Sequence, residues 1–333
     1  MPQAPVDEVL AIFQEGMMLL SIVACVHVLS LRRKGSVVPY EPRRPVPWGP
    51  VGCLLALLLL TALGYQAIVG SRHAVDVVES SRKAMSAFDL ISTMVAQLII
   101  VLVFLFVVAM FSNASARDIG VASNNRQRLR DVSIGAAACL AALAPVFFTQ
   151  LTMMYFFFPD TMKSGQPLIK QLMANPDPTM LVVAAVATVI IAPICEEITF
   201  RLLFQGWLER WEDDRLGWRT PAIETPLPAG ESEPLAEAAK QVELSATPLP
   251  EPVPPRKGVG GIAYGWFPIF VSAAAFGLAH YGDGPEPVPL FVFGLVLGYV
   301  YQRTHRILPG IVAHALFNLF TMIILWRLMY HHG

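Results

Sequence analysis

Three charged side chains lie in an otherwise apolar stretch of the sequence. Glu196, Glu197 and Arg201 are flanked on both sides by valine, isoleucine, leucine and phenylalanine. An apolar stretch of this kind is typical of a membrane span. Insertion of a charged side chain into the hydrocarbon layer of a membrane costs at least ~2.5–3.5 kcal/mol, so such a side chain must face a protein interior or a water-filled cavity. A carboxylate in such a cavity can act as a general base towards water. We therefore expect a polar site within the membrane that is suited to hydrolysis of an acyl group.

Two histidines in later apolar stretches could complete this site. His280 follows Phe276 by four positions, and His314 precedes Asn318 by the same spacing. Residues four apart lie on one face of a helix, so His314 and Asn318 are expected to point the same way. An imidazole can share the attacking water or shuttle its proton. A histidine and an amide on one face can also donate hydrogen bonds to a developing oxyanion.

The sequence leaves open the role of the second carboxylate, Glu197, and whether a metal is bound. Glu197 and Arg201 are four residues apart, which predicts an ion pair that orients Glu196, with direct chemistry as the alternative. No histidine is followed by glutamate, so the HExxH motif is absent. The sequence leaves metal dependence open.

Composition places these residues in an all-α, multi-pass membrane protein. The chain is 55% hydrophobic and 15% charged, and its net charge of −1 gives no basis for nucleic-acid binding. A helix needs ~20 apolar residues to cross the hydrocarbon core. The sequence predicts eight spans, with the polar site in the last four, near residues 9–31, 49–70, 88–111, 132–158, 180–208, 262–281, 288–303 and 307–329. Pro193, four residues before Glu197, predicts a kink beside the site.

The distribution of positive charge predicts the orientation. Of the 24 lysine and arginine residues, seventeen fall in loops on one side of the predicted spans and six on the other. Because loops rich in these residues stay in the cytoplasm, both termini are expected outside it. We expect the plasma membrane as the location.

The chain divides into two membrane regions and a linker. Residues 1–179 carry the first four spans and no recognisable motif, whereas residues 180–333 carry the polar site. Residues 212–261 are rich in proline, glutamate and alanine, a composition that favours disordered backbone. We expect a cytoplasmic linker there, which interrupts the second region.

The motifs, taken in order, resemble those of the CPBP family of membrane proteases. This family includes the type II CAAX prenyl endopeptidases, lysostaphin-resistance-protein-A-like proteins and bacteriocin self-immunity proteins. The resemblance covers residues 193–318, and the linker is longer than the family pattern leads us to expect. The motifs that carry it are Glu196-Glu197-x-x-x-Arg201, Phe276-x-x-x-His280 and His314-x-x-x-Asn318.

The resemblance implies an intramembrane endopeptidase that hydrolyses a peptide bond near or within the membrane. Its partners would be the lipid bilayer and a membrane-associated protein or peptide substrate, which carries a prenyl group in the best-known branch. The resemblance implies that Glu196 and His280 activate the attacking water, that His314 and Asn318 stabilise the oxyanion, and that Glu197 and Arg201 support them. The family is often described as metal-dependent, and the resemblance allows a divalent metal such as zinc bound by Glu196, His280 and His314, because two histidines and one carboxylate leave a coordination position open.

Two other classes of function remain open. A transporter or proton-coupled carrier also uses buried glutamate, histidine and arginine, although the first four spans show no repeat of the last four. A non-catalytic immunity or scaffold protein could keep the same motifs. Proteolysis by the purified protein, with Glu196→Ala as the control, would separate an enzyme from both.

Overall fold

The computed structural model describes residues 4–35, 37–42, 45–50, 87–116, 118–121, 124–158, 178–218, 255–281 and 285–331, and its regular elements are helical. Two π-helical segments, η2 (Ala187–Ile191) and η3 (Glu197–Gln205), interrupt the long helix that carries the charged motif. A short 3-10 helix, η4 (Val259–Gly261), precedes the last three helices. The α-helices are α1 (Ala4–Lys34), α3 (Ala87–Ser112), α4 (Asn125–Phe156), α6 (Pro178–Val186), α7 (Ala192–Glu196), α8 (Gly206–Leu216), α10 (Trp266–Leu278), α11 (Pro287–Thr304) and α12 (Ile307–His331).

Five stretches of the described chain are long and apolar enough to cross a membrane. They are Glu8–Arg33, Ala87–Ser112, Asn125–Phe156, Pro178–Leu216 and Ile307–Arg327, and they correspond to five of the eight expected spans. The expected span at 49–70 lies almost wholly outside the described residues. The other two expected spans are the shorter helices α10 and α11, of 13 and 18 residues. At ~1.5 Å per residue α10 extends only ~20 Å, which is less than the ~30 Å hydrocarbon core.

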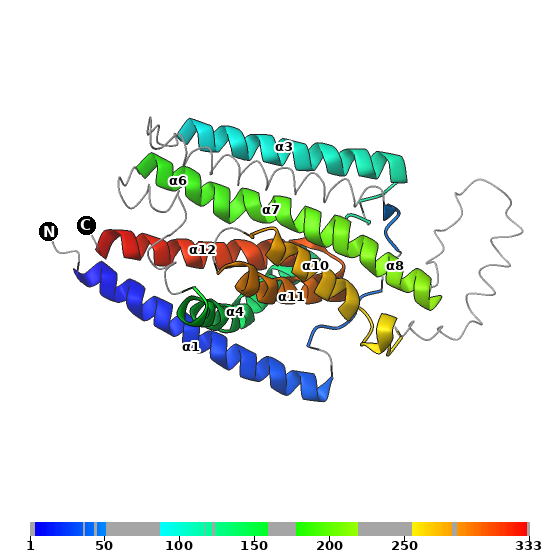
Figure 1. The fold of residues 1–333 in the computed structure, drawn as a ribbon, viewed down its shortest axis with the longest axis horizontal. Helices are drawn as coiled ribbons and strands as arrows, with labels where there is room; N and C mark the ends of the chain where they lie inside the picture. The colour runs from blue at the N-terminus through cyan, green and yellow to red at the C-terminus, as the bar shows by residue number, and fades with distance from the viewer. Residues whose placement is uncertain are drawn as a thin grey trace, which may run out of the picture.

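The helices pack around the long helix that runs from α6 through α8. α3 lies alongside this helix, and α12, α10 and α11 lie on its other side (Figure 1). α10 and α11 form a closely packed pair, and α4 packs against both α11 and α12. α1 in turn packs on α4. The first region of the chain therefore contributes directly to the core around the motif-bearing helices.

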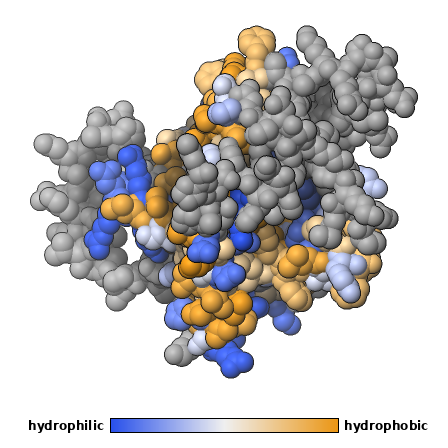
Figure 2. Space-filling model, turned by 90° about the vertical axis from the view of Figure 1, so that its left-hand side faces the viewer, coloured by the Kyte–Doolittle hydropathy of each residue, from blue (hydrophilic) through white to orange (hydrophobic). Residues whose placement is uncertain are grey.

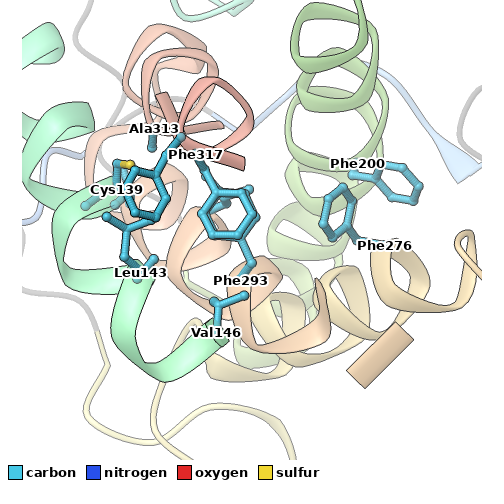
Figure 3. Packing of buried hydrophobic residues seen from close by; sticks show 13 residues of the cluster. Cys139, Leu143, Val146, Phe200, Phe276, Phe293, Ala313 and Phe317 are labelled. Carbon is cyan, nitrogen blue, oxygen red and sulfur yellow. The ribbon is translucent and has the colours of Figure 1, made fainter. Parts of the chain in front are cut away.

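A buried aromatic core holds these helices together. Phe293 of α11 and Phe317 of α12 are stacked with ring centroids 4.4 Å apart, and Phe200 of η3 meets Phe276 of α10 edge-on at 5.3 Å (Figure 3). Leu143 of α4 completes one side of the cluster. Aromatic pairs of this kind contribute ~0.5–1.5 kcal/mol beyond the burial of their surface. The cluster thus fixes three late helices relative to the charged motif.

Pro193 lies in α7, between two π-helical segments, and a kink of the helix axis there stays a prediction. Proline lacks the N–H that would bond the carbonyl four residues earlier, so the regular ladder is interrupted there. Widened turns of this kind make carbonyl oxygens accessible to other donors. Three side chains from distant segments use such oxygens: Asn318 Nδ2 donates to Thr188 O at 2.7 Å, Ser272 Oγ to Phe200 O at 2.9 Å and Trp48 Nε1 to Leu203 O at 3.1 Å.

Apolar side chains also cover much of the outer surface. Large hydrophobic residues of α1 and α3, such as Leu19 and Phe106, are well exposed. Apolar side chains also lie on the end of the molecule seen in Figure 2. Soluble monomeric proteins rarely expose contiguous apolar surface on this scale. Lipid tails are the solvent that suits such helices.

The two ends of the expected linker at 212–261 are folded. α8 continues to Leu216, and Glu212 on its last turns is fully buried. The Glu212 carboxylate accepts hydrogen bonds from the N–H groups of Val259, at 3.2 Å, and Gly265, at 2.9 Å. Residues 219–254 lie outside the described part of the chain, so disorder in that stretch stays a prediction.

Candidate active site

Glu197 lies at the centre of a buried chain of polar side chains. Its Oε2 is 3.5 Å from Arg201 Nε, and its Oε1 is 3.2 Å from His314 Nδ1. Both Glu197 and Arg201 have 0% exposure. An unpaired charge at such a position would cost several kcal/mol, so the two side chains neutralise each other. The ion pair expected from the four-residue spacing is therefore present.

Arg201 is held on its other side by α10. Its NH1 group donates a hydrogen bond to Ser272 Oγ at 2.8 Å, and the Ser272 hydroxyl donates one to Phe200 O at 2.9 Å. The guanidinium carbon also lies 5.1 Å from the centre of the Phe276 ring, a favourable cation–π distance. These contacts fix the guanidinium, and through it they fix the carboxylate of Glu197.

His314 lies between the two adjacent glutamates. Its Nε2 is 3.7 Å from Glu196 Oε2, while its Nδ1 faces Glu197. A ring nitrogen donates when it is protonated and accepts when it is not, and both nitrogens of His314 face oxygen atoms that can accept. The arrangement is therefore suited to proton transfer.

A cavity of about 550 Å³ adjoins this group and lies between α3, α4, the α6–α7 helix, α10, α11 and α12. Four of the six site residues expected from the sequence line it: Glu196, His280, His314 and Asn318. Glu197 and Arg201 are not among the lining residues and lie behind Glu196. The side chain of Glu196 is 19% exposed, whereas that of Glu197 is 1% exposed. The two adjacent carboxylates thus have different environments.

Hydrogen bonds to the main chain orient two of the cavity residues. His280 Nδ1 lies 2.9 Å from Phe276 O. A carbonyl only accepts, so Nδ1 carries a proton, and Nε2 accepts when the ring holds no second proton. Asn318 uses one of its two amide protons to bind Thr188 O, which leaves a second donor. His280 can therefore accept a hydrogen bond, and Asn318 can donate one.

The sequence-based interpretation missed several polar residues of the cavity wall. They lie outside the three motifs, on segments read only as membrane spans or loops. An isolated polar residue within a predicted span was the available indication for most of them. These residues are Thr93 and Gln97 of α3, Gln150 of α4, Thr321 of α12 and Glu286 just before α11.

The metal-binding alternative is not supported by the geometry. Within the described residues, no group of three or more histidine, cysteine, aspartate or glutamate side chains could hold a metal ion. His314 directs both nitrogens at carboxylates, and His280 directs Nδ1 at a carbonyl. The expected set of Glu196, His280 and His314 is not among such groups.

Comparison with known proteins identifies the part of the chain that carries this site. Residues 178–225 and 256–320 match the family model of the Rce1-like type II CAAX prenyl endopeptidases, and these ranges contain all six expected site residues. No match is found among curated proteins or among solved structures. The helices long enough to cross a membrane agree with a multi-pass membrane protein. The chain therefore carries a domain of the Rce1-like type II CAAX prenyl endopeptidase (CPBP) family, and that family consists of proteases.

Proposed function

We propose that this protein is an intramembrane endopeptidase in which Glu196 activates a water for attack on a peptide bond. The observation that carries the proposal is the contrast between the two adjacent glutamates. Glu197 is buried against Arg201, whereas Glu196 lines the cavity with its Oε2 3.7 Å from His314 Nε2. Glu196 can therefore exchange a proton with a molecule in the cavity, as a general base must.

In the proposed reaction, the attacking water lies between Glu196 and His280. Nε2 of His280 accepts a hydrogen bond from the water and orients it, because Nδ1 is engaged with Phe276 O. Glu196 accepts a proton while the water oxygen bonds to the carbonyl carbon, and the carbonyl π electrons move to its oxygen. The tetrahedral intermediate then breaks its C–N bond, and the leaving amine takes the proton from Glu196. The products are a carboxylic acid and an amine.

The oxyanion of this intermediate is proposed to bind His314 and Asn318. With Nδ1–H donated to Glu197, a doubly protonated His314 presents Nε2–H towards the Glu196 side of the site. Asn318 presents its second N–H, since Thr188 O holds the first. Donors that are fixed before the reaction stabilise developing charge without reorganisation, and each can contribute ~2.7–4 kcal/mol. Glu197 and Arg201 support this arrangement through His314.

Membership of the protease family implies a peptide substrate, and we propose one anchored in or near the membrane. Beyond the polar residues, the cavity wall is apolar, with Leu90, Met94, Met322 and Leu325 among its members. Such a wall suits a hydrophobic peptide segment or the lipid of a prenylated C-terminus. Cleavage of a peptide with and without a lipid group distinguishes these two substrates.

We also propose eight spans in the plasma membrane, with both termini outside the cytoplasm. In support, three of the loops expected to be cytoplasmic come together at one end of the molecule. Glu41, in the first of them, forms ion pairs with Arg130 and Arg306. Arg303 Nε donates to Val38 O at 2.8 Å. Segments that share one end of a bundle belong on one side of the membrane, as the charge distribution predicts.

The test is cleavage of a fluorogenic peptide, with and without a farnesyl group, by the purified protein in lipid nanodiscs. Glu196→Gln keeps the shape of the side chain but removes the base, so we expect cleavage to be lost and the melting temperature to be retained. Glu15→Gln, an exposed position on α1, is the matched control and should cleave normally. Cleavage at the wild-type rate by Glu196→Gln would overturn the proposed role.

A further inference from the structure

The wall of the cavity carries two glutamine side chains from helices outside the three motifs. Gln97 lies on α3 and Gln150 on α4, and both line the cavity that contains Glu196, His280 and Asn318. Neither helix lies within the ranges that match the protease family, which begin at residue 178. The first region of the chain therefore supplies part of the wall around the proposed catalytic groups.

Both amides lack a partner in the described part of the protein. No hydrogen bond or other polar contact from Gln97 or Gln150 to a described residue is present. An amide in an apolar environment without a hydrogen bond is costly, on the order of several kcal/mol. Both side chains are half-buried, and their amides remain available to a molecule that enters the cavity.

The chemistry of the wall favours a peptide main chain as that partner. A glutamine amide offers one acceptor and two donors, which complement the N–H and C=O of a peptide unit. Peptide groups in a hydrocarbon layer need such partners as much as glutamine does. Among the described residues that line the cavity there is no lysine or arginine, while Glu196 and Glu286 are acidic. An anionic headgroup would therefore find little attraction here, and an uncharged peptide unit fits better.

We propose that Gln97 and Gln150 bind the main chain of the substrate and position its scissile peptide bond against Glu196. The inference rests on the proposed function, because it needs a peptide in this cavity. Under this proposal both glutamines position the substrate, and α3 and α4 contribute to substrate selection. An extended peptide advances ~3.3 Å per residue, so contacts on the two helices would set its register relative to the catalytic groups.

The first experiment measures binding in the Glu196→Gln background, which holds a peptide without cleaving it. The probe is a fluorescent farnesylated CAAX-type peptide, titrated onto the protein in nanodiscs. Gln97→Met and Gln150→Met keep the length of the side chain and remove its hydrogen bonds. We expect the Kd to rise about 3- to 10-fold for each, as the loss of one neutral hydrogen bond predicts. Gln127→Met, on α4 but outside the cavity, is the matched control and should bind normally.

A second experiment tests whether the peptide main chain is the group that is bound. Peptides in which one backbone N–H is replaced by an ester oxygen should bind more weakly to the Glu196→Gln protein at the contacted position. At that position, the same ester should cause no further loss in the protein that also lacks Gln97 or Gln150. Equal losses in all proteins at every ester position would show that the glutamines do not bind the main chain.

These results separate the inference from the proposed function. If the wild-type protein cleaves the peptide, but both methionine substitutions leave binding and, with Glu196 intact, cleavage unchanged, the inference is wrong and the proposed proteolytic function is unaffected. If the glutamine variants weaken binding although the wild-type protein never cleaves, the peptide site stands and proteolysis is wrong. In an active protein, we expect KM to rise together with a fall in kcat, because a shifted peptide is also poorly aligned.

Discussion

Gly310 of α12 lies directly against the buried carboxylate of Glu197. A Cβ atom at Gly310 would be 2.5 Å from Glu197 Oε2, which is closer than real Cβ atoms approach. One helical turn further along α12, His314 binds the other oxygen of the same carboxylate at 3.2 Å. A single face of α12 therefore provides both the space for Glu197 and one of its hydrogen-bond partners.

Gly310→Ala should displace Glu197 and with it the orientation of His314. Overpacking of a filled interior costs ~1–3 kcal/mol, so we expect a lower melting temperature. We also expect turnover per folded molecule to fall at least ~10-fold, because small misplacements of catalytic groups are costly. Gly16→Ala on α1, where a Cβ would meet nothing within 4 Å, is the control and should leave turnover unchanged. Normal turnover in Gly310→Ala would show that the position of Glu197 does not matter for the reaction.

Asn318→Ala should lower turnover far more than it weakens substrate binding. Loss of a donor to the oxyanion reduces kcat by ~10²–10³. The variant also loses the bond to Thr188 O, so a melting shift of a few degrees is expected. Asn318→Asp should be equally poor or worse, because a carboxylate repels the oxyanion. A large melting shift with normal turnover per folded molecule would instead indicate a structural role.

Deletion of residues 226–254 should leave the fold and peptide hydrolysis largely unchanged. Loop length enters the closure entropy only as a small logarithmic contribution. Glu212→Ala is the contrasting variant, because it removes the acceptor for the N–H groups of Val259 and Gly265. Loss of buried hydrogen bonds costs ~1–3 kcal/mol, so this variant should melt several degrees lower. A comparable loss of thermal stability on the deletion would mean that the deleted segment is docked.

Cysteine-accessibility labelling should report the orientation of the chain. Single cysteines placed within residues 35–47 or 225–255 are expected to react only from the cytoplasmic side. Cysteines beside Lys163 or Gly333 should react from the opposite side, because seventeen of the lysine and arginine residues fall in loops on the predicted inner side. A cytoplasmic C-terminus would imply an odd number of spans. The short helices α10 and α11 would then be the first to re-examine.

Local patterns in the sequence predicted most of the described helices and four of the residues that line the cavity. Hydropathy located five of the stretches that can cross a membrane. The four-residue spacing predicted the Glu197–Arg201 ion pair, since neighbours on a helix meet whatever the rest of the fold does. The three motifs also indicated the protease family, which the comparison confirmed.

Contacts between distant segments could not be predicted in this way. Hydropathy does not distinguish a full span from the 13-residue helix α10, because both are equally apolar. The sequence predicted a kink at Pro193 but not the π-helical segments η2 and η3 on either side of it. These π-helical segments contain the carbonyl oxygens that accept hydrogen bonds from Asn318, Ser272 and Trp48.

The sequence by itself placed glutamate, histidine and asparagine side chains within apolar stretches, and the tertiary structure decided how these side chains divide between the cavity and the buried interior. Glu196 and Glu197 are adjacent in the chain and alike in chemistry, yet one lines the cavity and the other is buried. That division depends on α12, which brings Gly310 and His314 to the second carboxylate. It also depends on α3 and α4, which close the cavity with Gln97 and Gln150. The physical reason is that helix propensity and hydropathy act between near neighbours, whereas burial and proton sharing depend on the packing of whole helices.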